Sequence, residues 1–313
     1  MAFAALFPGQ GSQTVGMLAD FEMECPDIKE TFNEASDALG YDLWVLAQEG
    51  PAERLSLTEI TQPLMLTAGV ALYRAWSQAN GQGVSYVAGH SLGEYTALTA
   101  VGSLQLADAV QLVRARGQFM QEAVPKGTGA MAAVIDLDDD KIEAVCAQVA
   151  TNTGLVIEAV NYNAPGQLVI AGHADAIEAS LPILKKAGAK RALTLSVSAP
   201  FHCALMKPAA ERLQERLAAI DVKVPSVPVI QNVSIQPESD VSVIRKQLIK
   251  QTFSPVRWTQ TIRSFLGLGV QVAAEFGPGA VLCGLAKRIE TDAQHYPLGK
   301  HELFKKALQE INA

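Results

Sequence analysis

One short segment, Gly89-His90-Ser91-Leu92-Gly93, restricts the possible folds of this chain more than any other feature. It matches G-x-S-x-G, in which glycines allow a sharp turn from a strand into a helix and leave the serine exposed. The apolar residues 84–88 predict a buried strand before the turn, and residues from Glu94 onward predict a helix after it. An ordinary glycine-rich turn can match the same pattern. The flanking strand and helix favour a nucleophile elbow carrying Ser91.

Strands and helices alternate elsewhere in the chain. Residues 3–7 are an apolar run that ends in a glycine-rich loop, and residues 270–276 are a second run followed by Gly277-Pro278-Gly279 and a helical stretch. This alternation predicts an α/β fold with a parallel sheet. The uncharged residues 60–73, which include Gln62 and Pro63, are too few to cross a bilayer. They predict a buried helix with Pro63 in its first turn.

The middle of the chain has a different order of elements, β-α-β-β-α-β, which is typical of a ferredoxin-like unit. We therefore expect an inserted small domain at residues 126–198 and a catalytic domain made of residues 1–125 and 199–313. The elements predicted for the insertion are strands at 130–137, 156–162, 168–171 and 191–197, and helices at 139–149 and 174–187.

A serine nucleophile needs two hydrogen-bond donors for a developing oxyanion and a base that takes its proton. The Leu92 amide, at the start of the helix, is one candidate donor. The loop Pro8-Gly9-Gln10-Gly11 could supply another, although taken alone it reads more simply as a tight turn. It matches neither nucleotide-binding glycine motif.

The chain has five histidines, and His202 is the candidate base. It follows a predicted strand and Pro200, at the mouth of a strand-to-helix turn, where α/β sheets place catalytic groups. The alternative is an ordinary loop histidine. The others are less well placed: His90 should point away from the serine, His173 lies in a turn, and His295 and His301 lie in the C-terminal tail.

The predicted helix at residues 105–124 carries two arginines that differ in their helical angle. Arg114 falls on a polar flank and is expected to be a solvated surface charge, whereas Arg116 falls inside the apolar arc. A buried guanidinium needs an anion and hydrogen bonds. The partner could be an internal carboxylate or the carboxylate of a substrate, which arginine binds in bidentate fashion.

Charge and cysteine spacing exclude some classes of function. The net charge of −7 argues against nucleic acid as a partner. The four cysteines form no C-x-x-C pair, so we expect no zinc site and reduced thiols, as in a cytoplasmic protein. The N-terminus lacks the basic and apolar regions of a signal peptide. No metal or redox cofactor is expected.

Together these residues resemble the malonyl-CoA:acyl carrier protein transacylases over essentially the whole chain. The segments that carry the resemblance are Phe7-Pro8-Gly9-Gln10-Gly11-Ser12, Gly89-His90-Ser91-Leu92-Gly93-Glu94, Arg114-Ala115-Arg116-Gly117 with Met120-Gln121, Asn161-Tyr162-Asn163-Ala164-Pro165-Gly166-Gln167, Ser198-Ala199-Pro200-Phe201-His202, and Gln251 ahead of Ser254-Pro255-Val256.

The resemblance implies an α/β-hydrolase-like core with a ferredoxin-like insertion, and an enzyme that moves a malonyl group from malonyl-CoA to holo acyl carrier protein for fatty acid synthesis. It implies a cytoplasmic monomer with no membrane and no nucleic-acid partner. The roles that it implies are Ser91 as the acylated nucleophile, His202 as acid and base, Gln251 orienting His202 through its backbone carbonyl, Gln10 and Leu92 as oxyanion-hole amides, and Arg116, Phe201 and Gln62 as substrate-binding residues.

Several alternatives stay open. Phe201 is bulkier than the residue found before the histidine in many bacterial members, although a bulky aromatic there disfavours an α-methyl branch on the acyl group. A serine hydrolase or thioesterase would share the elbow, and a catalytically inactive scaffold or a polyketide extender loader is conceivable. An acidic carrier needs a local basic patch. Candidates, any of which could simply be solvated, are Lys185, Lys186, Lys190, Arg191, Lys287 and Arg288.

Overall fold

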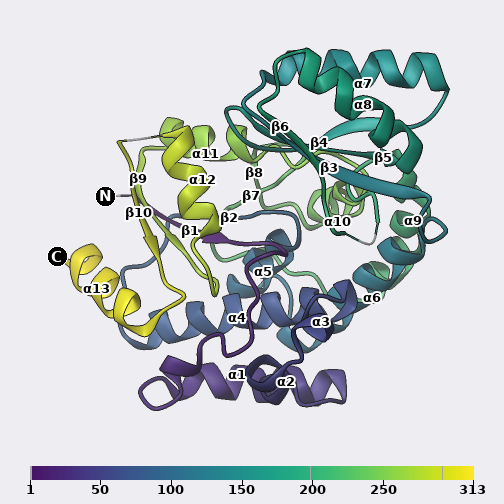
Figure 1. Ribbon diagram of the computed structural model, residues 1–313. Coiled ribbons are helices and arrows are strands. Elements are labelled where there is room, and N and C mark those ends of the chain that lie inside the picture. The colour runs from purple at the N-terminus through teal and green to yellow at the C-terminus, as the bar shows by residue number, and fades with distance from the viewer. Residues whose placement is uncertain (1, 198, 291) are drawn as a thin grey trace.

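The computed structural model describes residues 2–197, 199–290 and 292–313, and its elements form two sheets with helices around them (Figure 1). The larger sheet has the strand order β10-β9-β1-β2-β7-β8. Every neighbouring pair in it is parallel except β7 and β8. Its strands are β1 (Ala2–Phe7), β2 (Tyr86–Gly89), β7 (Val229–Ile230), β8 (Pro237–Glu238), β9 (Val270–Glu275) and β10 (Gln294–Pro297).

Helices cover both faces of this sheet, which explains why β1 is apolar throughout. Phe3, Ala5 and Phe7 pack into a core shared with α1 (Pro26–Leu39) and α4 (Thr58–Gln78). Ala4 and Leu6 point to the opposite face, into a second core shared with α11 (Trp258–Gly267) and α12 (Val281–Ile289). The remaining helices of this part are α2 (Leu43–Glu49), α3 (Ala52–Leu55), α5 (Leu92–Ala100), α6 (Leu106–Glu122), α9 (Lys207–Ala218), α10 (Val241–Gln251), α13 (His301–Asn312), and the short 3₁₀ helices at Ala19–Phe21 and Ala204–Met206.

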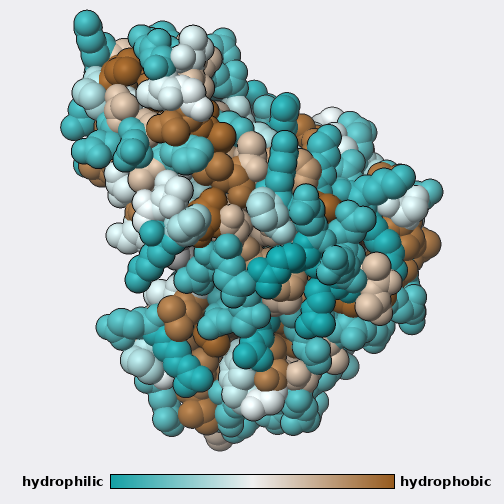
Figure 2. All heavy atoms as spheres, turned by 90° about the vertical axis from the view of Figure 1, so that its right-hand side faces the viewer, coloured by the Kyte–Doolittle hydropathy of each residue, from teal (hydrophilic) through white to brown (hydrophobic). Residues whose placement is uncertain are grey.

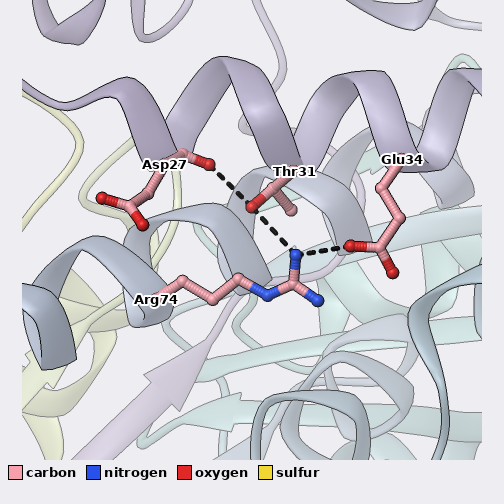
Figure 3. A network of polar contacts seen from close by, with 4 residues as sticks. All are labelled: Asp27, Thr31, Glu34 and Arg74. Carbon is pink, nitrogen blue, oxygen red and sulfur yellow. Dashed lines mark hydrogen bonds and ion pairs between the residues drawn. The ribbon is translucent and has the colours of Figure 1, made fainter.

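Helix α4 runs beneath the sheet and is tied to α1 by a polar contact at the rim of the core (Figure 3). Arg74 of α4 donates to Glu34 at 2.6 Å and to the Thr31 hydroxyl at 3.2 Å. The helix begins at Thr58, so Pro63 is its sixth residue and not in its first turn as predicted. The uncharged run from which the helix was predicted starts at residue 60, so it omits the first two residues of the helix, Thr58 and Glu59.

The second sheet is antiparallel and has the order β4-β5-β3-β6. Its strands and helices follow the predicted β-α-β-β-α-β order: β3 (Gly129–Ile135), α7 (Asp139–Thr153), β4 (Ile157–Ala164), β5 (Gln167–His173), α8 (Ala174–Lys186) and β6 (Arg191–Thr194). Both helices lie on the side of the sheet away from the larger sheet (Figure 1), over a hydrophobic core of their own.

The other face of the second sheet packs toward the rest of the chain. Met131, Val160 and Val169 form a cluster there with Cys203, and Phe201 packs against it. Seen from the side in Figure 2, the outer surface of the molecule is mostly hydrophilic with scattered hydrophobic side chains. Each helix in the described ranges is too short or too polar to span a bilayer.

Candidate active site

Ser91 lies on a strained turn between β2 and α5. Its φ of 54° and ψ of −109° fall in a region that side chains rarely adopt. A Cβ on Gly89 would lie 1.8 Å from the carbonyl carbon of Gly93, and a Cβ on Gly93 would lie 1.9 Å from the carbonyl oxygen of Phe7. Only glycine fits at either position, so these residues force the serine to project from the end of the strand.

His202 completes a hydrogen-bonded chain with the serine. Its Nε2 lies 2.7 Å from the Ser91 Oγ, and its Nδ1 lies 2.9 Å from the backbone oxygen of Gln251. A carbonyl oxygen only accepts, so Nδ1 carries the proton and Nε2 accepts from the serine hydroxyl. Burial, reinforced by the nearby Arg116 charge, lowers the pKa of His202 to about 3. The imidazole is therefore neutral, as a general base must be.

The position predicted for His202, after a strand of the parallel sheet, is wrong in part. The preceding strand, β6, ends at Thr194 instead of residue 197 and belongs to the antiparallel sheet. His202 therefore does not stand at the end of a parallel strand. It lies in the segment that leads from the second sheet toward α9, with a φ of 64°. Its hydrogen bonds to the Ser91 Oγ and to the Gln251 oxygen hold the imidazole at the elbow.

The remaining histidines have other contacts. His90 Nε2 lies 2.8 Å from Asn163 Oδ1, so this ring nitrogen does not bond to Ser91. The sequence predicted that His90 would point away from the serine, but its side chain lines the same cavity. Burial lowers the pKa of His90. His173 Nδ1 accepts from the Val156 amide. Within the described ranges, His202 is the histidine hydrogen-bonded to the Ser91 hydroxyl.

Arg116 is 2% exposed and points from α6 at the serine. It donates to Gln62 Oε1 at 2.8 Å, to Gln251 Oε1 at 2.9 Å and to the Ser91 Oγ at 3.3 Å. These partners are neutral oxygens, and no carboxylate among the described residues forms an ion pair with it. Burial lowers the pKa of Arg116, but a guanidinium stays protonated in proteins. Its charge is thus available to an anion.

Arg114 differs from its prediction as a solvated charge. It is half-buried, its guanidinium lies 5.6 Å from the centre of the Tyr41 ring, and it donates to the Leu39 oxygen at 3.4 Å. The helical angle separated the two arginines correctly. It could not show that α1 and the residues after it cover the flank of α6 on which Arg114 lies.

The serine opens into a cavity of about 180 Å³ between the two sheets. Gln10, Gln62 and Phe201, all singled out in the sequence, line it. Leu92 is the first residue of α5, so its N–H is one of those that a helix leaves without an internal partner. The other residues around the cavity are His90, Ser91, Arg116, Met120, Met131, Asn161, Leu195, Val197 and His202.

Two residues without a predicted role, Asn232 and Glu94, stabilise the elbow by hydrogen bonds. The Ser91 amide donates to Asn232 Oδ1 at 2.8 Å, and Asn232 Nδ2 donates to the Gly89 oxygen at 2.7 Å. Glu94 is fully buried and accepts from the Asn232 amide at 2.9 Å. Glu94 directly follows the elbow motif, so a role for it at the site could have been suspected from the sequence. Asn232 follows a two-residue strand that has no recognisable sequence pattern. The described residues contain no cluster of metal-ligating side chains.

The chain is similar to known proteins over most of its length. The chain matches the acyl transferase domain family over residues 5–297. It is 56% identical over 287 residues to the malonyl CoA-acyl carrier protein transacylase of Escherichia coli K12, covering 92% of each chain. The transacylase structure from Coxiella burnetii has a TM-score of 0.97 at 46% identity, covering 100% of this chain and 98% of that one. A malonyl-transacylase solved with a holo type II polyketide-synthase carrier protein also has a TM-score of 0.97, at 47% identity, covering 99% and 100%.

Proposed function

Because the chain belongs to the acyl transferase domain family, and within it to the malonyl-CoA–acyl carrier protein transacylases, we propose that Ser91, His202 and Arg116 carry out malonyl transfer in it. The enzyme is an acyl carrier protein S-malonyltransferase. Its substrates are malonyl-CoA and acyl carrier protein. The observation that carries the residue assignment is the buried guanidinium 3.3 Å from the hydroxyl of a serine that is itself bonded to a neutral histidine.

In the first half-reaction the serine is acylated. Ser91 Oγ attacks the thioester carbonyl of malonyl-CoA while its proton passes to His202 Nε2, over the 2.7 Å contact already present. The amides of Gln10 and Leu92 donate to the tetrahedral oxyanion, and losing one such donor costs about 3 to 4 kcal/mol. The carbon–sulfur bond then breaks, and the coenzyme A sulfur takes the proton from His202.

The second half-reaction reverses these steps with a different thiol. The pantetheine thiol of the carrier protein loses its proton to His202 and attacks the serine ester. The tetrahedral anion collapses, and the Ser91 oxygen regains its proton from His202. The Gln251 carbonyl accepts from Nδ1 throughout, so it keeps the imidazole in the required tautomer.

Arg116 holds the malonyl carboxylate in this proposal. Arginine has five N–H donors, and the three observed contacts use at most three of them. Gln62 and Gln251 fix the plane of the guanidinium through amide oxygens, and no carboxylate among the described residues forms a direct ion pair with it. An acyl group that ends in a carboxylate would bind there, next to the nucleophile. Phe201, on the cavity wall, limits the width available beside the acyl chain.

We also propose a finer description of the fold. The parallel sheet with a serine elbow after β2 supports an α/β-hydrolase-like catalytic domain made of residues 1–125 and 199–313. The order β4-β5-β3-β6 supports a ferredoxin-like insertion at residues 126–198. Ser198, the last residue of that range, lies outside the described residues, as does Met1. A monomer in the cytoplasm that supplies fatty acid synthesis, with no nucleic-acid partner, remains our prediction.

The carrier protein would approach the cavity where the two sheets meet. Of the predicted basic residues, Lys190 pairs with Asp136 at 3.4 Å, and Arg288 donates to Gln167 and to the Pro165 oxygen in the β4–β5 turn. Arg288 of α12 therefore bridges the two sheets. We propose that it and Lys287 present positive charge to an acidic carrier beside this junction.

Mapping the site of malonylation tests the proposal. Brief exposure to malonyl-CoA followed by proteolysis and mass spectrometry should place one malonyl group on the peptide that contains Ser91. Ser91→Ala should abolish the adduct, and His202→Ala should slow its formation by 100-fold or more, since general-base catalysis contributes about 10²- to 10⁴-fold. An adduct on another residue, or unchanged labelling in Ser91→Ala, would rule the assignment out.

A further inference from the structure

Behind the serine and the arginine lies a buried carboxyl group that the reaction steps do not use. Glu94, in the first turn of α5, is 0% exposed. Its Oε2 accepts two hydrogen bonds, from the backbone N–H of Asn232 at 2.9 Å and from Gln251 Nε2 at 3.0 Å. Burying a carboxyl group is costly, and burial raises the pKa of Glu94 to about 7. A group in this position requires a structural or functional explanation.

The Gln251 side chain connects Glu94 to Arg116. Its Oε1 accepts from Arg116 at 2.9 Å, while its Nε2 donates to Glu94 and, at 2.9 Å, to the Ser91 backbone oxygen. Rotating the amide by half a turn would face its NH₂ to the guanidinium and its oxygen to two acceptors. Glu94 and the Ser91 carbonyl therefore fix which end of the amide faces Arg116.

From these contacts we propose that Glu94 is a positioning residue for malonyl selectivity: it holds the Gln251 amide in the orientation that aims Arg116 at the acyl site. The inference rests on the proposed role of Arg116 in binding the malonyl carboxylate. Glu94 itself touches neither the Ser91 hydroxyl nor the cavity. Its effect passes through Gln251, whose backbone carbonyl orients His202 while its side chain orients Arg116.

A purely structural role for Glu94 makes a different prediction. Glu94 also accepts a hydrogen bond from the backbone N–H of Asn232. The Asn232 side chain in turn stabilises the elbow by hydrogen bonds to the Ser91 N–H and the Gly89 oxygen. If that support were the whole role, removing Glu94 would impair transfer of every acyl group alike. If Glu94 positions Arg116, malonyl transfer should suffer more than acetyl transfer, because an acetyl group has no carboxylate for Arg116 to bind.

The test measures kcat/KM for malonyl-CoA and acetyl-CoA in matched variants. Glu94→Ala should lower the malonyl value by roughly 10- to 100-fold more than the acetyl value, by analogy with the loss of activity seen when a residue that supports a metal ligand is removed. Glu94→Gln should restore the ratio to within about threefold of the parent, because an amide oxygen can replace Oε2 and accept both hydrogen bonds.

Two controls separate selectivity from damage. Glu275→Ala removes another fully buried glutamate, which accepts from the Cys283 amide at 2.8 Å and does not line the cavity. It should lower the melting temperature without changing the malonyl-to-acetyl ratio. Asn232→Ala should lower both activities by a similar factor. If Glu94→Ala fails to fold, Glu94→Asp, whose shorter side chain cannot reach Gln251, should show the same loss of selectivity.

Equal losses for the two acyl groups in Glu94→Ala or Glu94→Asp would overturn the inference while leaving the proposed function intact. Failure of the parent enzyme to form a malonyl-Ser91 adduct would instead overturn the proposed function. A third result, in which Glu94→Gln loses as much selectivity as Glu94→Ala, would also contradict the inference, because the hydrogen bonds could then not be what matters.

Discussion

If Arg116 binds the malonyl carboxylate as proposed, replacing it by alanine should lower malonyl transfer much more than acetyl transfer. In the folded protein the guanidinium is 2% exposed and is held by Gln62 and Gln251. Without the guanidinium, a malonyl carboxylate would meet the amide oxygens of Gln62 and Gln251 with no positive charge beside it. Truncating one partner of a buried charge pair costs about 2 to 5 kcal/mol. At about 3 kcal/mol, kcat/KM for malonyl-CoA falls by roughly 150-fold.

Acetyl transfer should respond differently. An acetyl group needs no cation, and of the three hydrogen bonds that the variant loses, only the 3.3 Å bond to the Ser91 hydroxyl involves a reacting atom. We expect kcat/KM for acetyl-CoA to fall by about tenfold, much less than for malonyl-CoA, since a hydrogen bond from a charged group contributes about 1.5 kcal/mol or more. Arg114→Ala, two residues earlier on α6, is the matched control and should leave the ratio of the two values unchanged.

The assay is the initial rate of acyl transfer to holo carrier protein from each coenzyme A ester, with the melting temperature of every variant measured alongside. A parallel fall for both acyl groups at unchanged melting temperature would refute the reasoning, because Arg116 would then support the reaction without recognising the acyl group. An unchanged malonyl rate would refute it equally.

Three further predictions concern other parts of the site. Gly93→Ala should destabilise the fold by more than about 3 kcal/mol in chemical denaturation, because the added Cβ would lie 1.9 Å from a backbone oxygen; Gly284→Ala, in an exposed part of α12 with no atom within 4 Å, should stabilise it by about 0.5 to 1 kcal/mol. Burial raises the pKa of Glu94 to about 7 in the folded protein, above its value in the unfolded chain, so the folded protein binds this proton more tightly. The stability that this proton contributes is fully present below about pH 4.5 and is lost as the pH rises to about 8. Over that range the free energy of unfolding should fall by about 3 kcal/mol relative to that of Glu94→Gln. If the difference in the free energy of unfolding between the parent protein and Glu94→Gln did not change with pH, the raised pKa of Glu94 would be contradicted. Phe201→Ala should widen the cavity and raise the rate with methylmalonyl-CoA relative to malonyl-CoA by about tenfold, and an unchanged ratio would show that Phe201 does not limit the acyl group.

The parts of the site that sequence could predict are those set by local geometry. The turn from β2 into α5 requires glycine at two positions because the clashing atoms lie within the elbow itself or on the neighbouring strand, β1. The burial of Arg116 followed from its angle on one helix. The order of strands and helices in the second sheet followed from apolar periodicity, which each segment carries on its own.

Contacts between distant segments were beyond the same reasoning. Arg116 meets Gln62 from α4 and Gln251 from α10, which are 54 and 135 residues away in the sequence. Asn232 follows a strand of two residues, too short to have a periodicity. His202 contacts Ser91 although the strand before it, β6, belongs to the antiparallel sheet and not to the parallel one as predicted. Which segments meet is decided by packing of the whole chain.

The malonyl ester on Ser91 should react with a thiol and resist hydrolysis by water. Intact mass spectrometry after exposure to malonyl-CoA and removal of the excess tests this directly. The malonyl adduct should persist in buffer and disappear within seconds of adding holo carrier protein, which should gain the same mass. Loss of the adduct in buffer at the same rate with or without the carrier would contradict the account and identify the chain as a hydrolase.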